Sequence, residues 1–198
     1  MTDGDGVGPG PLRVCFVCTG NICRSPIAEV VLRSMAAGTV LDGGATLADH
    51  LVVDSAGTGN WHAGEPMDPR AAAALAGAGY PDHGHRARAF EAAWFDELDL
   101  VVALARTHQQ TLAGLARRRA GGGEGYRERL VLLRSYDPRA GGSVDVPDPY
   151  YGDGRDFEAC LALVEAGCRG LADDLARRVA TRPGQPAGGP NVTSDSAS

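Results

Sequence analysis

A cysteine and an arginine stand six positions apart near the start of this 198-residue chain, as Cys18 and Arg24 in the segment CTGNICRS. The residues between them include a glycine and an asparagine, which favour a tight turn. A cysteine thiolate is a strong nucleophile, and a guanidinium can hold two oxygens of an oxyanion at once. The pair therefore indicates covalent chemistry on an oxyanion, and both phosphate and arsenate fit.

The flanking residues predict that this segment lies between a strand and a helix. The apolar run at 12–17 predicts a buried strand. Residues 26–37 predict a helix with Ser25 as N-cap and Pro26 at its first position. The helix dipole and the N–H groups of the turn would then favour an anion beside Cys18, and the Ser25 hydroxyl could donate to its thiolate. The alternative is a core cysteine beside a surface arginine, which the flanking elements disfavour.

The segment VCFVCTGNICRSPIAE resembles the active-site segment of the low-molecular-weight protein tyrosine phosphatases. Later segments resemble this family in the same order, namely VDSAGT, WHAG with DPRA, GHRAR and DPYYG. The resemblance runs over about residues 12–180 and is closest to the secreted-type enzymes of actinobacteria. It implies a cysteine-dependent protein-tyrosine phosphatase that needs no metal or other cofactor.

The resemblance assigns the catalytic roles to Cys18, Arg24 and Asp148. Cys18 would attack phosphorus and carry a phosphocysteine, Arg24 would hold the phosphoryl oxygens, and Asp148 would serve as general acid and then as general base. Asp148 lies in the proline-containing segment DVPDPYYGD, where the residues alone favour a turn cap for this Asp-Pro pair and the resemblance favours the general acid. The residues expected to bind the phosphoryl group or the substrate are Thr19, Gly20, Asn21, Ile22, Cys23, Ser25, Trp61, Tyr150 and Tyr151.

Ser55 and His85 are expected to support the site from behind. In the family, the side chains at these positions hydrogen-bond the asparagine that corresponds to Asn21. Asparagine tolerates the left-handed backbone that tight anion-binding loops need. The paired tyrosines and Trp61 would offer aromatic surface to a phosphotyrosine ring, although a half-buried tryptophan fits the sequence equally well. Both tyrosines are also candidate targets of a tyrosine kinase.

The five cysteines indicate free thiols rather than a disulfide framework. Cys15 and Cys18 have C-x-x-C spacing, but residues three apart on a strand point to opposite faces, and no second pair completes a zinc site. Cys23 could form a reversible disulfide that protects Cys18, or could merely fill space. Cys160 and Cys168 fall on the last predicted helix as core or surface thiols.

Four apolar runs alternate with helical patterns between two polar ends. This alternation predicts a Rossmann-like α/β domain over 12–181, with a parallel twisted sheet between two layers of helices and the site at the carboxyl ends of the strands. The resemblance implies the four-stranded, phosphotyrosine phosphatase I type of this fold. Residues 1–11 predict a flexible extension, and 182–198 a disordered tail. The runs at 12–17, 50–54, 98–104 and 129–133 predict strands, those at 26–37, 68–78, 106–118 and 155–180 predict helices, and 90–94 predicts a short helical turn.

The net charge of −6 does not favour binding of nucleic acid. No segment reaches the length of a membrane span, and the first residues lack the pattern of a signal peptide. We therefore expect a monomeric cytoplasmic enzyme that acts on phosphotyrosine proteins, with secretion by a route that needs no signal peptide left open.

Three other functions compete with this interpretation. A thioredoxin-coupled arsenate reductase shares the fold and the Cys-x5-Arg segment, but its relay cysteines do not match the positions of Cys160 and Cys168. Protein-arginine phosphatases carry threonine at the position of Ile22, whose apolar side chain suits phosphotyrosine better. A catalytically inactive phosphopeptide-binding module is disfavoured by the intact catalytic set.

The sequence departs from the family at Ala105, where many members have aspartate. In the family this acid is structural and helps to order the neighbouring loop. Its absence is therefore expected to affect stability or loop dynamics more than chemistry.

Overall fold

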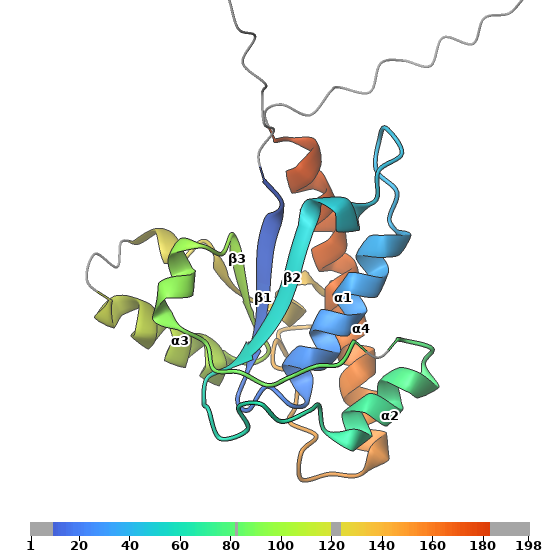
Figure 1. Ribbon diagram of the computed structural model, residues 1–198, viewed down its shortest axis with the longest axis vertical. Helices are drawn as coiled ribbons and strands as arrows, with labels where there is room; N and C mark the ends of the chain where they lie inside the picture. The colour runs from blue at the N-terminus through green and yellow to red at the C-terminus, as the bar shows by residue number, and fades with distance from the viewer. Residues whose placement is uncertain (1–9, 82, 120–123, 183–198) are drawn as a thin grey trace, which may run out of the picture.

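Four parallel strands form one sheet in the computed structural model, which describes residues 10–81, 83–119 and 124–182. The strand order is β2-β1-β3-β4, which confirms the predicted α/β class (Figure 1). The predicted extension at 1–11 and tail at 182–198 lie almost wholly outside the described residues. The strands are β1 (Leu12–Cys18), β2 (Leu51–Gly57), β3 (Leu100–Ala103) and β4 (Leu130–Leu132).

The helices form a layer on each face of the sheet (Figure 1). Helices α1 (Arg24–Gly38) and α4 (Gly154–Ala180) cover one face, and α3 (Arg106–Arg118) covers the other. Helix α2 (Pro69–Gly77) packs against α4. The turn predicted at 90–94 forms two residues later, as the 3-10 segment η2 (Ala92–Asp96). Three further 3-10 segments were not predicted, namely η1 (Leu47–His50), η3 (Glu124–Tyr126) and η4 (Leu133–Tyr136).

The side chains of β1 alternate between two cores. Val14, Phe16 and Cys18 pack among residues of α1 and α4, whereas Cys15 and Val17 pack among residues of β3 and α3. All five are buried, as expected for a parallel strand covered on both faces. Cys15 and Cys18 therefore point to opposite faces, so the C-x-x-C spacing joins them in no common site.

The prediction that Ser25 caps the first helix is wrong. Helix α1 begins at Arg24, and Cys23 occupies the N-cap position without a side-chain capping bond. The Ser25 hydroxyl lies 3.0 Å from the Cys18 sulfur and accepts a hydrogen bond from Asn21 Nδ2 at 2.9 Å. The hydroxyl therefore serves the loop between Cys18 and Ser25 (the 18–25 loop) instead of the helix end.

A close contact between α4 and η4 fixes the chain that leads to the predicted acid. A methyl group built at Gly170 of α4 would lie 2.0 Å from the carbonyl oxygen of Tyr136 in η4. The same 3-10 segment carries the buried Arg134, which donates to the carbonyl oxygen of Asp145 at 3.4 Å. The packing of η4 on α4 thus positions the loop that contains Asp148.

We predict opposite effects of the same substitution at two helical glycines. Gly170→Ala should lower the free energy of unfolding by about 1–3 kcal/mol, because the added methyl overpacks against backbone. Gly114→Ala in α3 should raise it by up to about 1 kcal/mol, because alanine favours helix and its methyl meets the flexible ends of Arg118 and Arg117. Urea unfolding of both variants measures the difference, and stabilisation by Gly170→Ala would contradict the packing described here.

Candidate active site

The 18–25 loop turns its carbonyl groups outward. The carbonyl oxygens of Cys18, Thr19 and Ile22 accept hydrogen bonds of 2.8–3.0 Å from backbone N–H groups outside the loop. The Asn21 oxygen lies 2.7 Å from Nε2 of His85. In a trans peptide unit the N–H group points away from the C=O group. The N–H groups that follow these carbonyls therefore face the centre of the loop and form a cradle for an oxyanion, namely those of Thr19, Gly20, Ile22 and Cys23.

Asn21 holds the loop in this shape. It is the one non-glycine residue with a positive φ in the described ranges, at 57°, and its side chain is fully buried. Its Nδ2 donates at 2.9 Å to the hydroxyls of both Ser25 and Ser55, and its Oδ1 accepts from the N–H of Arg88 at 2.9 Å. These three bonds use both polar atoms of the side chain, and His85 contacts the backbone carbonyl oxygen of the same residue. Ser55 and His85 thus both contact Asn21.

Glu29 extends this support behind the loop and was not predicted from the sequence. Its carboxylate accepts a hydrogen bond from the Ser55 hydroxyl at 2.7 Å. Oε1 of the same carboxylate pairs with Arg33 one helical turn away, at 2.9 Å. Oε2, which accepts the bond from Ser55, lies 4.0 Å from Nδ1 of His85. Helix α1 therefore carries both the arginine of the cradle and the acid that braces Ser55.

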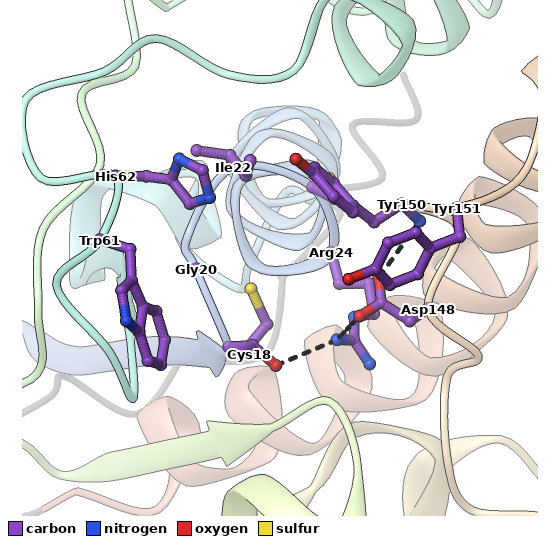
Figure 2. A pocket seen from close by; sticks show the side chains of 11 residues that line it. Cys18, Gly20, Ile22, Arg24, Trp61, His62, Asp148, Tyr150 and Tyr151 are labelled. Atoms are coloured by element: carbon purple, nitrogen blue, oxygen red, sulfur yellow. Dashed lines mark hydrogen bonds and ion pairs between the residues drawn. The ribbon is translucent and has the colours of Figure 1, made fainter.

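A pocket of about 160 Å³ opens above the loop, with the Cys18 sulfur at its base (Figure 2). Trp61 lies on one side of the pocket, and Tyr150 and Tyr151 lie opposite (Figure 2). Trp61 is 70% exposed, so the alternative of a half-buried tryptophan is wrong. The side chains of Asn21 and Ser25 are buried behind the cradle, so binding of the phosphoryl group by these two residues stays a prediction for their backbone N–H groups. The other predicted pocket residues all line it: Cys18, Thr19, Gly20, Ile22, Cys23, Arg24, Trp61, Asp148, Tyr150 and Tyr151.

His62 also lines the pocket and was not predicted. Its ring lies against the loop at Gly20, where an added methyl would meet the ring carbon Cδ2 at 2.9 Å. Its Nδ1 lies 2.7 Å from the carboxylate of Glu65, which fixes the ring orientation. Glycine at position 20 is therefore what allows the imidazole to close this side of the pocket.

Cys18 differs from the neighbouring cysteines in its surroundings. Its sulfur lies 3.0 Å from the Ser25 hydroxyl at the base of the pocket. Burial, with a smaller effect of the Asp68 carboxylate, raises the pKa of the Cys23 thiol to about 12. Burial likewise raises the pKa of Cys160 to about 12. Both of these cysteines therefore stay as neutral thiols near pH 7.

Arg24 and Asp148 form an ion pair on the tyrosine side of the pocket, with 2.6 Å between Nη2 and Oδ2 (Figure 2). Arg24 also donates from Nη1 to the carbonyl of Val146 and from Nη2 to the Thr19 hydroxyl, both at 3.3 Å. Its buried Nε has no partner among the described residues. Asp148 Oδ1 accepts from the N–H of Tyr150 at 3.3 Å, so this side chain both caps its turn and faces the pocket.

Arg70, at the start of α2, holds the tyrosine loop and was not singled out from the sequence. It donates to the carbonyl oxygens of Gly152 at 2.9 Å and Tyr150 at 3.0 Å. Its guanidinium lies over the Phe157 ring, 4.7 Å from the centroid. Hydrogen bonds from Arg70 lower the pKa of the Asp68 carboxyl, which keeps the Asp68–Arg70 pair charged. The only sequence signal for this contact is the DPRA segment itself.

Asp145 supplies the N-terminal cap that Ala105 cannot. Ala105 occupies the N-cap position of α3 and makes no side-chain capping bond. Asp145 Oδ1 instead accepts a hydrogen bond from the N–H of Arg106 at 2.7 Å. Asp145 precedes Asp148 by three residues, so this bond links the start of α3 to the acid loop.

We predict that Asp145→Ala lowers the free energy of unfolding by about 1 kcal/mol, as loss of a capping side chain does. It should also reduce turnover, because the acid loop loses its attachment to α3. Thermal unfolding and steady-state kinetics measure the two effects. Asp42→Ala, at an exposed position, is the matched control and should change neither. A variant at position 145 as stable and active as the control would disprove the link.

No metal cluster is found in the described part of the chain, where no three His, Cys, Asp or Glu side chains are placed to hold an ion. Within the same ranges, no helix is both long and apolar enough to cross a bilayer. That the protein works without a cofactor stays a prediction.

The fold and the site define an α/β protein with a cysteine at the base of an oxyanion cradle. Residues 13–181 match the family model of the low molecular weight phosphotyrosine protein phosphatases. This chain belongs to that family. It is also 52% identical to a low molecular weight protein-tyrosine-phosphatase of Streptomyces coelicolor over 172 residues, which cover 86% of this chain and 97% of that protein.

Two further comparisons agree. The chain is 47% identical to low molecular weight protein-tyrosine phosphatase A of Mycobacterium tuberculosis over 171 residues, 86% of this chain and 95% of that protein. The crystal structure of a protein tyrosine phosphatase from Entamoeba histolytica superposes with a TM-score of 0.74 at 26% identity, covering 85% of this chain and 99% of that one. The expected resemblance to actinobacterial members of the family is confirmed.

Proposed function

We propose that this protein hydrolyses phosphotyrosine in proteins through a phosphocysteine intermediate on Cys18. The observation that carries this proposal is the Cys18 sulfur at the base of a cradle of inward N–H groups, with Arg24 and Asp148 at the same pocket. Membership of the phosphotyrosine phosphatase family supports the same chemistry.

In the first step, the Cys18 thiolate attacks phosphorus and the bond to the tyrosyl oxygen breaks. The Ser25 hydroxyl lies 3.0 Å from the sulfur and 3.2 Å from the Ala56 carbonyl oxygen, and it donates to the thiolate before attack when its one hydrogen turns from the carbonyl to the sulfur. The phosphoryl oxygens accept hydrogen bonds from Arg24 Nε, which has no partner among the described residues, and from Nη2, which otherwise donates to Asp148. Asp148, in its protonated form, gives its proton to the leaving oxygen.

In the second step, a water molecule attacks the phosphocysteine. Asp148, now a carboxylate, takes a proton from this water, and Cys18 leaves as a thiolate. The products are inorganic phosphate and the starting enzyme. The cradle N–H groups and Arg24 stabilise the charge on the equatorial oxygens in both transition states.

The pocket walls favour an aromatic phosphoester. Trp61 is 70% and Tyr151 94% exposed, so both can stack on a tyrosyl ring without moving out of a core. Ile22 lines the same pocket with an apolar side chain, where arginine phosphatases carry threonine. An arsenate reductase would need a mobile pair of relay thiols, whereas Cys160 and Cys168 are buried in α4, 3% and 0% exposed. These features favour phosphotyrosine.

Tyr151 is also the better candidate for modification by a tyrosine kinase. Its side chain is 94% exposed, whereas Tyr150 is 38% exposed and lies edge-on to it. A phosphate on Tyr151 would stand at the mouth of the pocket and compete with substrate. The monomeric state and the cytoplasmic location stay predictions from the sequence.

We predict that Cys18→Ser abolishes phosphate release from p-nitrophenyl phosphate, because serine lacks a reactive thiolate. Cys160→Ala, which changes a buried thiol outside the pocket lining, is the matched control and should keep most of the activity. A metal chelator should leave the activity of the unchanged protein and of Cys160→Ala as it is, since no step of the mechanism uses a metal. Full turnover by Cys18→Ser, or activity lost to the chelator, would refute the mechanism.

We predict that Asp148→Asn lowers kcat for a phosphotyrosine peptide by about 100-fold or more, the usual contribution of a general acid. The fall should be smaller for p-nitrophenyl phosphate, because nitrophenolate leaves without a proton more readily than a tyrosyl group with a pKa of about 10. Because kcat also contains the hydrolysis of the phosphocysteine, which both substrates share, kcat/KM is compared for the two substrates as well. An equal loss of kcat/KM for both substrates would assign Asp148 a role other than general acid.

A further inference from the structure

The Thr19 hydroxyl lies at the edge of the pocket between the guanidinium of Arg24 and the imidazole of His108, which are both buried. Thr19 is exposed and lines the pocket. Its Oγ1 accepts a hydrogen bond from Arg24 Nη2 at 3.3 Å and lies 3.0 Å from Nε2 of His108. His108 comes from the first turn of α3 and was not predicted as part of the site.

The surroundings of His108 decide which partner donates. The ring is 4% exposed, and its Nδ1 has no hydrogen-bond partner among the described residues. Burial, and then the charge of Arg24, lower the pKa of His108 to about 4, so the ring is neutral near pH 7 and carries one N–H group. A proton on Nδ1 would leave a buried donor without an acceptor, which is costly and rare. The proton therefore belongs on Nε2, which donates to Thr19.

The number of acceptor sites on Thr19 Oγ1 shows which further hydrogen bond this hydroxyl can make. A hydroxyl has two acceptor sites and one hydrogen. Arg24 and His108 occupy both acceptor sites of Thr19 Oγ1. The hydroxyl hydrogen is therefore not used in these two contacts, and Thr19 lines the pocket.

We propose that the Thr19 hydroxyl donates this hydrogen to an oxygen of the bound phosphoryl group, with His108 as the positioning residue that fixes its orientation. The inference rests on the proposed function and adds a side-chain donor to the backbone N–H groups of the cradle. The charged groups that act on His108 are Arg24, Asp148 and Asp145. Asp145 caps the same turn of α3 that carries His108.

Binding of inorganic phosphate tests the proposal without turnover. Isothermal calorimetry should show an affinity about tenfold weaker for Thr19→Val, which keeps the shape and removes a hydrogen bond to a charged group. Thr19→Ser keeps the hydroxyl and should recover most of the loss. Thr111→Val is the matched control, since that hydroxyl bonds only a carbonyl of its own helix, and it should bind as the unchanged protein does. Unchanged affinity in Thr19→Val would overturn the proposal.

A double-mutant cycle tests the role of His108. His108→Ala should weaken phosphate binding several-fold when Thr19 is present, because the hydroxyl hydrogen is then free to point elsewhere. In the Thr19→Val protein the same change should add nothing to the loss. Equal losses in both backgrounds would show that His108 acts only through folding, and would overturn its positioning role.

Failure of this inference differs from failure of the proposed function. If Thr19→Val binds phosphate normally while Cys18→Ser is inactive, only the role of the hydroxyl is wrong. If Cys18→Ser turns over normally, the catalytic mechanism is wrong, whatever the phosphate affinities are.

Discussion

The left-handed backbone of Asn21 determines the shape of the active site. Its φ of 57° lets the 18–25 loop reverse direction within a few residues, which turns the carbonyls outward and the N–H groups inward. The conformation is held by bonds to β2, to the 85–88 segment and to Ser25 in α1. Ser55 is available for this because β2 pairs with β1 in the register that sets Ser55 opposite Phe16, two residues before Cys18. The pairing register of β1 and β2 thus places Ser55 where its hydroxyl can hold Asn21.

The acid loop depends on a different kind of support. Three charged side chains hold it at separate points: Arg70 from α2, Arg134 from η4, and its own Asp145 at the start of α3. The contacts of Arg70 and of Asp145 join segments 80 and 39 positions apart, and that of Arg134 joins residues 11 apart. Asp148 is consequently positioned by the packing of α2, α3 and η4 around its loop.

The sequence predicted the elements that repeat a strong local pattern and missed those defined by distant partners. The strand before Cys18 is apolar except for Arg13, and the helical pattern at 106–118 is equally clear, so both were predicted within a residue. Ser25 has the right type for an N-cap, but the competing bond to Asn21 depends on a loop conformation that local propensity does not show. His108 and Arg70 bond residues more than 80 positions away, and no spacing rule identifies such a partner from one chain.

Because Arg24 and Asp148 form an ion pair, the phosphoester substrate and the phosphate product bind the pocket differently. Any anion that occupies the cradle must draw Arg24 away from the carboxylate, which costs part of its binding energy. A phosphoester compensates, because its bridging oxygen offers Asp148 a new hydrogen bond. Phosphate left in the cradle after the second step meets the same competition, because Asp148 can reclaim Arg24 Nη2 once it loses its proton. The carboxylate and the product therefore compete for one guanidinium, and this competition favours release of phosphate.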